Sequence, residues 1–417
     1  MAEQMKPSGI DWIKDIPSSW EINKVKYLAT EPGTLFLDGD WIESDVIEES
    51  GIRYLTTGNV GAGFYKEQGS GYISEKTFSE LHCLNVYPGD LMISRLNEPI
   101  GRSCIIPDTE SRYVVAVDNV ILRPNANYNK KFIMYGMNAD GYAEHANMIA
   151  RGATMSRISR SQLGQFWLAF PNIEEQQAIA DFLDKECAQI DSIAADLEKQ
   201  IALLQQYKKS LITETVTKGL DKSVPMKDSG VEWIGEIPTH WDKKRMKYFL
   251  SVSSGEAITN DQLEDGEYPV YGGGKQMGYF NKANVDKNQI LIGRVGANCG
   301  CVTITHTPSW ATDNALVVQT LCYFKYIYYI LISADLNRLN EANAQPLITG
   351  AKVGNCVVPF TANYTEQKQI AQYLDERCEK IEGLIIGKQK QLETIIQHKK
   401  SLIYEYVTGK KRVKEVQ

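Results

Sequence analysis

A few stretches of the 417-residue sequence carry residue types that could support catalysis or metal binding. The run GGGK, residues 272–275, resembles part of a phosphate-binding loop. That loop needs Ser or Thr after the lysine to hold Mg²⁺, and Gln276 stands there instead. Cys299, Cys301 and His306 could supply part of a zinc site. Structural zinc takes four ligands, usually with two to four residues between the cysteines, so free thiols are the favoured interpretation.

Two Asp-Asn pairs are the remaining candidates for carboxylate chemistry. Asp118-Asn119 and Asp313-Asn314 each precede a strand-like run, AVDNVILR and ATDNALVV, so a capping or turn role is favoured. The five histidines form no H-E-x-x-H motif, and the sequence has neither a nucleophile elbow nor a dinucleotide fingerprint. We therefore expect no enzymatic activity, no catalytic residue, no metal site and no cofactor.

Composition limits the class of protein. The length allows two or more domains, and no apolar run approaches the roughly 18–20 residues that a membrane span needs. The first residues lack the apolar stretch of a secretory signal. The eight cysteines lack the regular spacing of a disulfide framework, so we expect free thiols in a protein of the reducing cytoplasm. The net charge of −7 argues mildly against a nucleic-acid binder. It does not exclude one, because binding depends on where Lys and Arg lie.

The elements that would position any functional residue occur twice. MKPSGIDWIKDIPSSWEINKVKY at 5–27 and MKDSGVEWIGEIPTHWDKKRMKY at 226–248 are identical at 11 of 23 positions, including two Trp and a Pro. A second repeat starts with EEQQAIADFLD at 174 and TEQKQIAQYLD at 365, and each copy ends in KKSLI. Each half of the chain therefore has the same order: a head (the first repeat), a body of unlike sequence, and a closing segment (the second repeat). The copies of the first repeat lie 221 residues apart and those of the second repeat 191, so the second body is about 30 residues shorter. One scaffold with two unlike bodies is predicted.

The closing segments of both repeats are expected to be long helices. Asn172 with Glu175, and Asn363 with Glu366, have the spacing of a capping box, and Gly219 suits a helix end. The apolar stripes are Ile179, Phe182/Leu183, Ile190, Ile193, Leu197, Ile201, Leu204 and Leu211 in the first helix, and Ile370, Tyr373/Leu374, Ile381, Leu384/Ile385, Leu392, Ile395 and Leu402 in the second. Steps of three and four are typical of a coiled-coil seam. We expect the copies to pair antiparallel about a pseudo-twofold axis; packing of each helix on its own body is the alternative.

The bodies read as mixed helix and strand. GDLMISRLNEPIGRSCIIP from Gly89 and NQILIGRVGANCGCVTI from Asn288 both predict hairpins, and they share an Arg at 95 and 294. The heads carry Trp12, Trp20, Trp233 and Trp241, which are interpreted as packing residues where the body meets the helix. The fold class is α+β.

This pattern is similar to the specificity subunit of Type I restriction–modification systems. The resemblance rests on the two heads, SGIDWIKDIPSSW and SGVEWIGEIPTHW, the two helix starts and the two KKSLI ends, and it covers nearly the whole chain. It implies two target-recognition domains, each reading one half of a split, asymmetric site in double-stranded DNA. It also implies a helical spacer that sets the gap, two methyltransferase subunits docked on the chain, and a separate motor–nuclease restriction subunit.

The resemblance predicts the following division of the chain: target-recognition domain 1 at 1–170, spacer helix 1 at 171–220, target-recognition domain 2 at 221–361, spacer helix 2 at 362–410 and a tail at 411–417. The candidate DNA-contacting loop residues are Arg95, Asn97, Arg102, Arg151, Arg157 and Arg160 in the first body, and Lys275, Arg294, Asn298 and Lys352 in the second. Arg and Lys are expected on phosphates and Arg or Asn on base edges. Because Arg95 and Arg294 are shared by unlike bodies, we expect them to contact phosphate.

Two alternatives stay open at the level of sequence. The chain could serve a related restriction system whose methylase and nuclease are fused in one partner chain. It could also be a coiled-coil adaptor that never contacts DNA, although two elaborate unlike bodies would then lack a task.

Overall fold

The computed structural model describes residues 4–69, 71–150, 156–259, 263, 266–339 and 347–413. Within these ranges, no helix combines the length and the apolar character needed to cross a membrane. The chain divides into two compact units, unit 1 (Met1–Asp196 with Gln391–Gln417) and unit 2 (Leu197–Lys390). Each unit therefore contains one segment of each long helix, α5 (Ile173–Lys218) and α8 (Tyr364–Val407).

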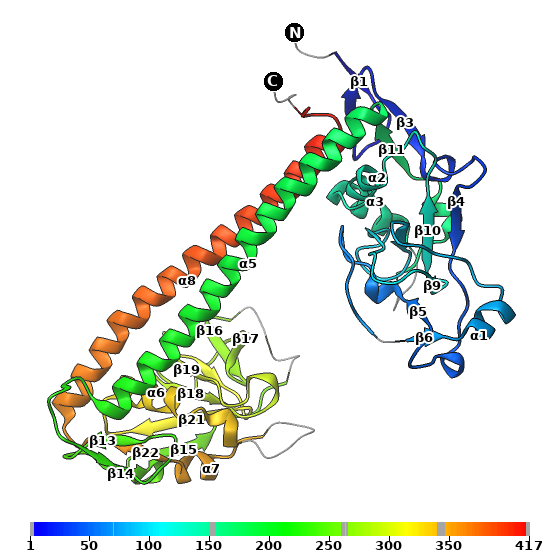
Figure 1. Cartoon of the computed structure of the whole chain (residues 1–417). Coiled ribbons are helices and arrows are strands. Elements are labelled where there is room, and N and C mark those ends of the chain that lie inside the picture. The colour runs from blue at the N-terminus through cyan, green and yellow to red at the C-terminus, as the bar shows by residue number, and fades with distance from the viewer. Residues whose placement is uncertain are drawn as a thin grey trace. The chain divides into compact units, whose positions relative to one another are not determined.

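The body of unit 1 is built on an antiparallel four-stranded sheet in the order β4-β10-β7-β8. Figure 1 shows β4 beside β10 in this sheet. Its strands are β4 (Leu35–Asp38), β7 (Leu91–Ser94), β8 (Ser103–Ile105) and β10 (Asn119–Arg123). A second sheet, β6-β5-β9, joins β5 (Ile52–Leu55), β6 (Tyr72–Ile73) and β9 (Tyr113–Val115), with β5 and β9 parallel. The helices of this body are α1 (Glu75–Glu80), α2 (Lys130–Met137), α3 (Asp140–Ile149) and α4 (Arg160–Leu163).

The body of unit 2 has sheets of the same composition. Its four-stranded sheet has the order β15-β21-β18-β19, and its three-stranded sheet, β17-β16-β20, again holds one parallel pair. These strands are β15 (Leu250–Ser254), β16 (Tyr268–Gly272), β17 (Lys275–Phe280), β18 (Ile290–Gly293), β19 (Val302–Ile304), β20 (Trp310–Ala311) and β21 (Ala315–Thr320). The helices are α6 (Phe324–Ser333) and α7 (Gly350–Asn355). Both predicted hairpins, β7–β8 and β18–β19, are confirmed.

The central strands of both sheets lie in the core because their sequences are almost continuously apolar. LMIS in β7 and ILIG in β18 are buried at every position. A strand covered on both faces has no need for alternating polar residues. The Asp-Asn pairs lie at the turns that lead into the neighbouring strands. Asp118 lies in the turn and Asn119 begins β10, whereas Asp313 and Asn314 both lie in the turn before β21.

Each head packs under the end of a long helix. The heads form hairpins, β1 (Met5–Pro7) with β2 (Asp15–Pro17) and β12 (Met226–Asp228) with β13 (Glu236–Pro238). A further head strand then pairs with the last strand of the body, β3 (Glu21–Lys24) with β11 (Trp167–Phe170) and β14 (Asp242–Arg245) with β22 (Val357–Phe360). Trp20 and Trp241 are fully buried, which confirms their packing role.

A glycine ends each long helix against one of these tryptophans. Gly219 follows α5 with φ +70°, and a Cβ there would lie 3.4 Å from the Trp241 ring. Gly409 follows α8 with φ +72°, and a Cβ there would lie 2.4 Å from Pro17 and 3.2 Å from Trp20. Left-handed backbone and close approach both select glycine. The end of α8 therefore packs on the first head, as the end of α5 packs on the second.

The N-termini of both long helices are capped as predicted, but among the described contacts the glutamate of the second capping box is used elsewhere. Asn172 Oδ1 accepts from the Glu175 N–H at 2.9 Å, and Asn363 Oδ1 accepts from the Glu366 N–H at 3.3 Å. The Glu366 carboxylate does not return to Asn363, because it accepts instead from Trp241 Nε1 at 3.0 Å and from a nearby Thr hydroxyl. The glutamate thus fastens the head to the helix rather than closing a box.

Burial along both long helices follows a strict alternation of four and three residues. The inward positions are Leu183, Cys187, Ile190, Ala194, Leu197, Ile201 and Leu204 in α5, and Leu374, Cys378, Ile381, Ile385, Lys388, Leu392, Ile395, Lys399 and Leu402 in α8. The predicted stripe was wrong at Ile193, which is 48% exposed, because the heptad position falls on the smaller Ala194. At the predicted pair Leu384/Ile385, Ile385 is the inward residue and Leu384 is 56% exposed.

The two long helices contact each other within each unit, where their segments lie side by side (Figure 1). In unit 1 the rings of Phe182 and Tyr406 lie 4.6 Å apart, and Lys399 Nζ donates to Asp191 at 2.6 Å. Contacts therefore move back along α8 as they advance along α5, so these segments run in opposite directions. In unit 2, Lys208 pairs with Glu382 at 2.6 Å.

A duplicated polar clamp ties each body to its long helix. In unit 1, the Tyr135 hydroxyl on α2 donates to Asp184 Oδ1 at 2.7 Å, and Lys131 pairs with the same carboxylate. In unit 2, Tyr329 on α6 donates to Asp375 Oδ1 at 2.9 Å, alongside Lys325 at 2.5 Å. Burial and the hydrogen bond to aspartate both raise the pKa of each tyrosine.

Removing one clamp carboxylate is expected to lower stability. Asp375→Asn should reduce the free energy of unfolding by about 1–2 kcal/mol, because a charge-assisted hydrogen bond and its lysine partner are both weakened. Urea unfolding followed by circular dichroism measures the change. The control is Glu376→Gln, one residue along α8 on the exposed face. Equal midpoints for the two variants would show that the clamp contributes nothing.

Candidate functional site

The candidate arginine shared by the two bodies lies inside unit 1 rather than on its surface. Arg95 follows β7 and is only 6% exposed. Its Nε lies 3.1 Å from Asp38 Oδ1, and its other guanidinium nitrogens donate to the carbonyls of Ile158 at 3.1 Å and Val117 at 2.6 Å. Burial lowers the pKa of Arg95, and Asp38 offsets part of that effect. Because Arg95 is buried and its terminal nitrogens donate to carbonyls of the protein, any role toward DNA would be indirect.

Arg157 and Arg160 extend this buried group to the surface. Arg157 pairs with Asp118 at 2.6 Å, and Arg160 Nε pairs with Asp38 at 3.0 Å. Asp118 also lies 3.9 Å from Arg95, so three guanidinium groups share two carboxylates. We call these five residues the arginine network. Its net charge is positive, and its exposed edge consists of the half-exposed Arg157 and Arg160 side chains, 49% and 38% accessible.

Arg102 organises the turn between β7 and β8. Its Nε donates to the Val60 carbonyl at 2.8 Å, one terminal nitrogen donates to the Thr57 carbonyl at 2.9 Å, and the other to carbonyls in the turn, including that of Asn97 at 2.9 Å. Burial lowers the pKa of Arg102. Asn97 itself is exposed with φ +60°, a left-handed conformation that asparagine tolerates. Arg102 thus presents Asn97 to solvent.

Unit 2 has an arginine at the same place but not the same network. Arg294 follows β18, and one terminal nitrogen donates to Ser254 Oγ at 3.2 Å and to the Asp313 carbonyl at 3.4 Å. Its Nε is buried without a hydrogen-bond partner among the described residues. Hydroxyl and carbonyl groups hold Arg294 less fully than carboxylates hold Arg95. The two bodies therefore use one backbone position in different electrostatic settings.

The other candidates in unit 2 lie on separate elements. Lys275 is exposed at the start of β17, and Asn298 ends the short turn Gly296–Asn298. Lys352 lies on α7 and donates to the Leu339 carbonyl at 3.2 Å. In unit 1, Arg151 lies outside the described residues. The structure therefore groups Arg95, Arg157 and Arg160 in one network and joins Arg102 to Asn97 in the neighbouring turn, while the candidates of unit 2 lie on separate elements.

The residue that sequence reasoning missed in unit 1 is Asp38. It ends β4 and holds both Arg95 and Arg160. The sequence offers only a carboxylate at the end of an apolar run, LFLD, with no spacing that connects it to arginines far along the chain. The pairing arises because β4 and β7 flank β10 in the sheet.

Loss of the buried cation should cost stability. Arg95→Ala removes the buried guanidinium that Asp38 and Asp118 share and leaves each carboxylate with one half-exposed arginine. We expect the free energy of unfolding to fall by about 3 kcal/mol, the lower end of the range for breaking a buried ion pair. Thermal and urea unfolding measure this loss. The control is Arg157→Ala, which removes a half-exposed arginine from the same network and should change stability far less. A similar small loss for both variants would contradict the structural role of Arg95.

A family model described as "Type I restriction modification DNA specificity domain" matches residues 20–203 and again 238–394. The chain belongs to this family. The MjaX specificity subunit of Methanocaldococcus jannaschii is 27% identical over 369 residues, which is 82% of this chain and 83% of that protein. The EcoBI specificity subunit of Escherichia coli is 32% identical over 194 residues, covering 41% and 40% of the two chains.

Solved structures match this specificity-domain chain in fold. One, described as showing complex assembly and conformational transition of the type I R-M system, has a TM-score of 0.71 and 11% identity and covers 94% of this chain and 98% of its own. The HsdS subunit from Thermoanaerobacter tengcongensis has a TM-score of 0.50 and 12% identity, with the same coverage. At such identities the match supports the fold alone.

Proposed function

We propose that this chain is the DNA-reading, non-catalytic specificity subunit of a Type I restriction–modification complex. Each body serves as a target-recognition domain and reads one half of a bipartite, asymmetric site in double-stranded DNA. The observation that carries the proposal is the match of the DNA specificity family to both halves of the chain, each of which contains the same order of sheet strands.

The proposal gives the long helices the role of a spacer. We propose that α5 and α8 pair as an antiparallel coiled coil about a pseudo-twofold axis, which makes the chain an internal repeat. The heptad burial and the contacts inside each unit support this pairing. A helix of 46 residues is about 69 Å long at 1.5 Å per residue. Such a length suits readers placed on grooves that recur every ~34 Å along one face of DNA.

Within unit 1, the arginine network suggests a division of labour. Arg157 and Arg160 keep accessible guanidinium edges for phosphate, while Arg95 holds the network together from inside. Asn97 is the base-edge candidate, because its amide is solvent-facing and Asn pairs well with adenine. We therefore propose that Arg95 positions the other arginines. This replaces the expectation from the sequence that Arg95 contacts phosphate directly.

In unit 2, Arg294 is the candidate for phosphate contact, because its guanidinium group has no carboxylate partner among the described residues. Lys275 is a second phosphate candidate and Asn298 a base-edge candidate. Lys352 is already engaged with a carbonyl, so its contribution would be smaller.

The proposed partners follow from the same assignment. Two methyltransferase subunits would dock on the chain and supply the S-adenosylmethionine chemistry, and restriction subunits would join through the complex. The relatives are named as Type I specificity subunits, which favours this arrangement over a fused methylase–nuclease partner. The complex would act on genomic DNA in the cytoplasm.

A gel-shift experiment tests the proposed function. The full chain, purified with its methyltransferase partner, is mixed with a random duplex library, and the bound fraction is sequenced. We expect enrichment of two short fixed sequences separated by a constant gap. A library that is not retained at all, or one enriched in a single continuous motif, would contradict the proposal.

A further inference from the structure

A basic and aromatic surface recurs on the two heads, at residues outside the sequence-based candidates. In unit 1 it follows β3 into the turn Val25–Tyr27, and in unit 2 it follows β14 into the turn Met246–Tyr248. Tyr27 and Tyr248 are 49% and 72% exposed. We call it the lysine–tyrosine surface: Lys24, Lys26, Tyr27 and Trp167 in unit 1, and Lys244, Arg245, Lys247 and Tyr248 in unit 2.

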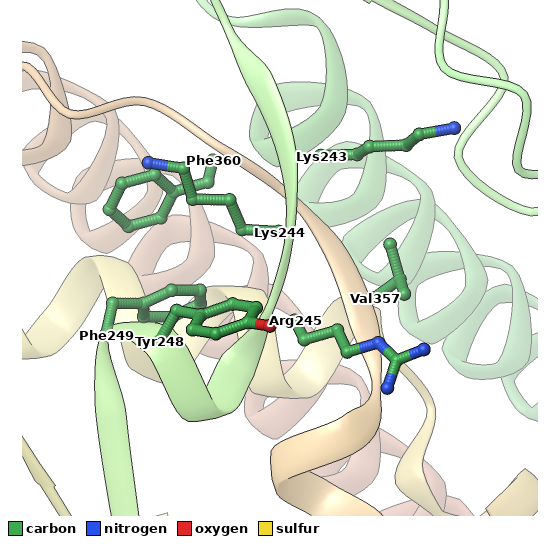
Figure 2. A pocket seen from close by; sticks show the side chains of 7 residues that line it. All are labelled: Lys243, Lys244, Arg245, Tyr248, Phe249, Val357 and Phe360. Atoms are coloured by element: carbon green, nitrogen blue, oxygen red, sulfur yellow. The ribbon is translucent and has the colours of Figure 1, made fainter.

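In unit 2, Lys244, Arg245 and Tyr248 of this surface line a hollow of about 570 Å³, together with Lys243, Phe249, Val357 and Phe360 (Figure 2). Phe249 and Phe360 stack with their centroids 4.5 Å apart, and Lys244 Nζ lies 4.8 Å above the Phe360 ring. Lys243 and Arg245 project from the other side of β14, as alternate residues of a strand must (Figure 2). Cations therefore line both sides of one strand around an aromatic floor.

In unit 1, lysines of the head also lie above aromatic rings. Lys24 Nζ lies 4.8 Å above the Trp167 ring, and Lys26 Nζ lies 4.8 Å above the Tyr27 ring. A glycine at or near the end of a short helix lies close to Lys26 in unit 1 and to Lys247 in unit 2. A Cβ on Gly164 would lie 3.1 Å from Lys26 Cβ, and a Cβ on Gly354 would lie 3.3 Å from Lys247 Cβ. The heads therefore seat the two lysines alike, although the bodies around them differ.

The cations of this surface are not neutralised by the protein. Lys26, Lys244, Arg245 and Lys247 form no ion pair within the part of the chain that the structure describes, and Lys24 donates only to a glutamine amide at 2.8 Å. Elsewhere in the described residues some Lys and Arg side chains do pair with carboxylates, as Arg95, Lys131 and Lys208 do. Aromatic rings lie beside the four lysines, and no carboxylate within the described residues competes with an anion for them.

We propose that the lysine–tyrosine surface of each unit binds the sugar–phosphate backbone of duplex DNA, independently of sequence. This inference rests on the proposed function and adds a second, non-reading contact to it. A backbone contact is the same for any target, so it belongs on the repeated heads rather than on the unlike bodies. Lysine is depleted at protein–protein interfaces, which argues against a protein occupant.

Continuity with the arginine network supports the DNA backbone as occupant. In unit 1, a Cβ on Gly164 would lie 3.1 Å from both Lys26 and the Phe36 ring, and the Phe36 carbonyl accepts from Arg160 at 2.8 Å. The head surface and the exposed edge of the network therefore adjoin, giving one basic tract. A DNA backbone bound at Arg157 and Arg160 could therefore extend along this basic tract.

The test is a salt titration of DNA binding by the full chain assembled with its methyltransferase partner. The triple variant K244Q/R245Q/K247Q is compared with K199Q/K368Q/K380Q, which removes three exposed lysines of the long helices in the same unit. The probes are a mixed-sequence duplex and a duplex that carries the recognised site. Each lost phosphate contact lowers the slope of log K against log salt by about 1, so the head variant should lose about 3.

The outcomes separate this inference from the proposed function. We expect the head variant to weaken binding to both probes by the same factor and the helix variant to leave both slopes unchanged. Binding by the wild-type complex with equal slopes for all three proteins would overturn the inference alone. Retained DNA binding with loss of the methyltransferase from the head variant would overturn it too, and would identify a protein-docking surface. No DNA binding by the wild-type complex would overturn both proposals.

Discussion

Replacing Trp241 with alanine is expected to lower the free energy of unfolding by about 3–5 kcal/mol, the range found for large buried aromatic residues. Trp241 is fully buried, and its Nε1 donates to Glu366 Oε1 at 3.0 Å. Its ring also packs against Gly219 at the end of α5. The substitution would therefore open a cavity and leave a carboxylate without its donor where the head and both long helices meet.

Urea unfolding followed by circular dichroism measures this effect, with Trp41→Ala as the matched control. Trp41 is 71% exposed, so its removal should change stability by less than about 0.5 kcal/mol. Glu366→Gln separates the two contributions, because it keeps an acceptor for Trp241 and removes only the charge. A Trp241→Ala midpoint equal to that of Trp41→Ala would mean that the head does not anchor the helices.

Lengthening both long helices by one heptad should widen the gap in the DNA site without altering its two half-sequences. Gln200 and Lys388 contact each other, so seven residues inserted after each keep the inward positions in register. The added length is about 10 Å, which corresponds to about three base pairs at 3.4 Å each. Mapping of methylated sites in a host carrying the variant measures the gap.

The matched control inserts the same seven residues into α5 alone. Beyond the insertion, the inward residues of α5 would then be shifted by two helical turns relative to their partners on α8. The contacts between the two helices on that side of the insertion would be lost. We expect modification to be abolished in that variant. An unchanged gap after the double insertion would show that the helices do not set the spacing.

The parts of the fold that could be predicted are those in which a local pattern has one physical solution. Asn172 before a long apolar period, and Gly219 after it, mark the ends of a helix within a few residues, and α5 begins at Ile173 and ends at Lys218. The pattern did not show which apolar residues face inward. Ile193 is exposed because Ala194, a weaker hydrophobic signal, occupies the heptad position.

The side-chain networks could not be predicted because they join distant parts of the chain. Arg95 reads as a solvent-facing cation after a strand, yet the sheet order brings Asp38 to it and buries it. Glu366 reads as half of a capping box, yet the head delivers Trp241 to its carboxylate. Lys26 and Tyr27 recur as Lys247 and Tyr248 in the repeated heads, but only the structure shows that these lysines lack carboxylate partners within the described residues.

The central claim is that two independent readers share one chain. It is tested most directly by exchanging residues 28–170 for the corresponding body of another specificity subunit and mapping the methylated sites. We predict that one half of the methylated DNA site will have a new base sequence, while the other half and the length of the gap stay unchanged. A change in both halves, or in neither, would contradict it.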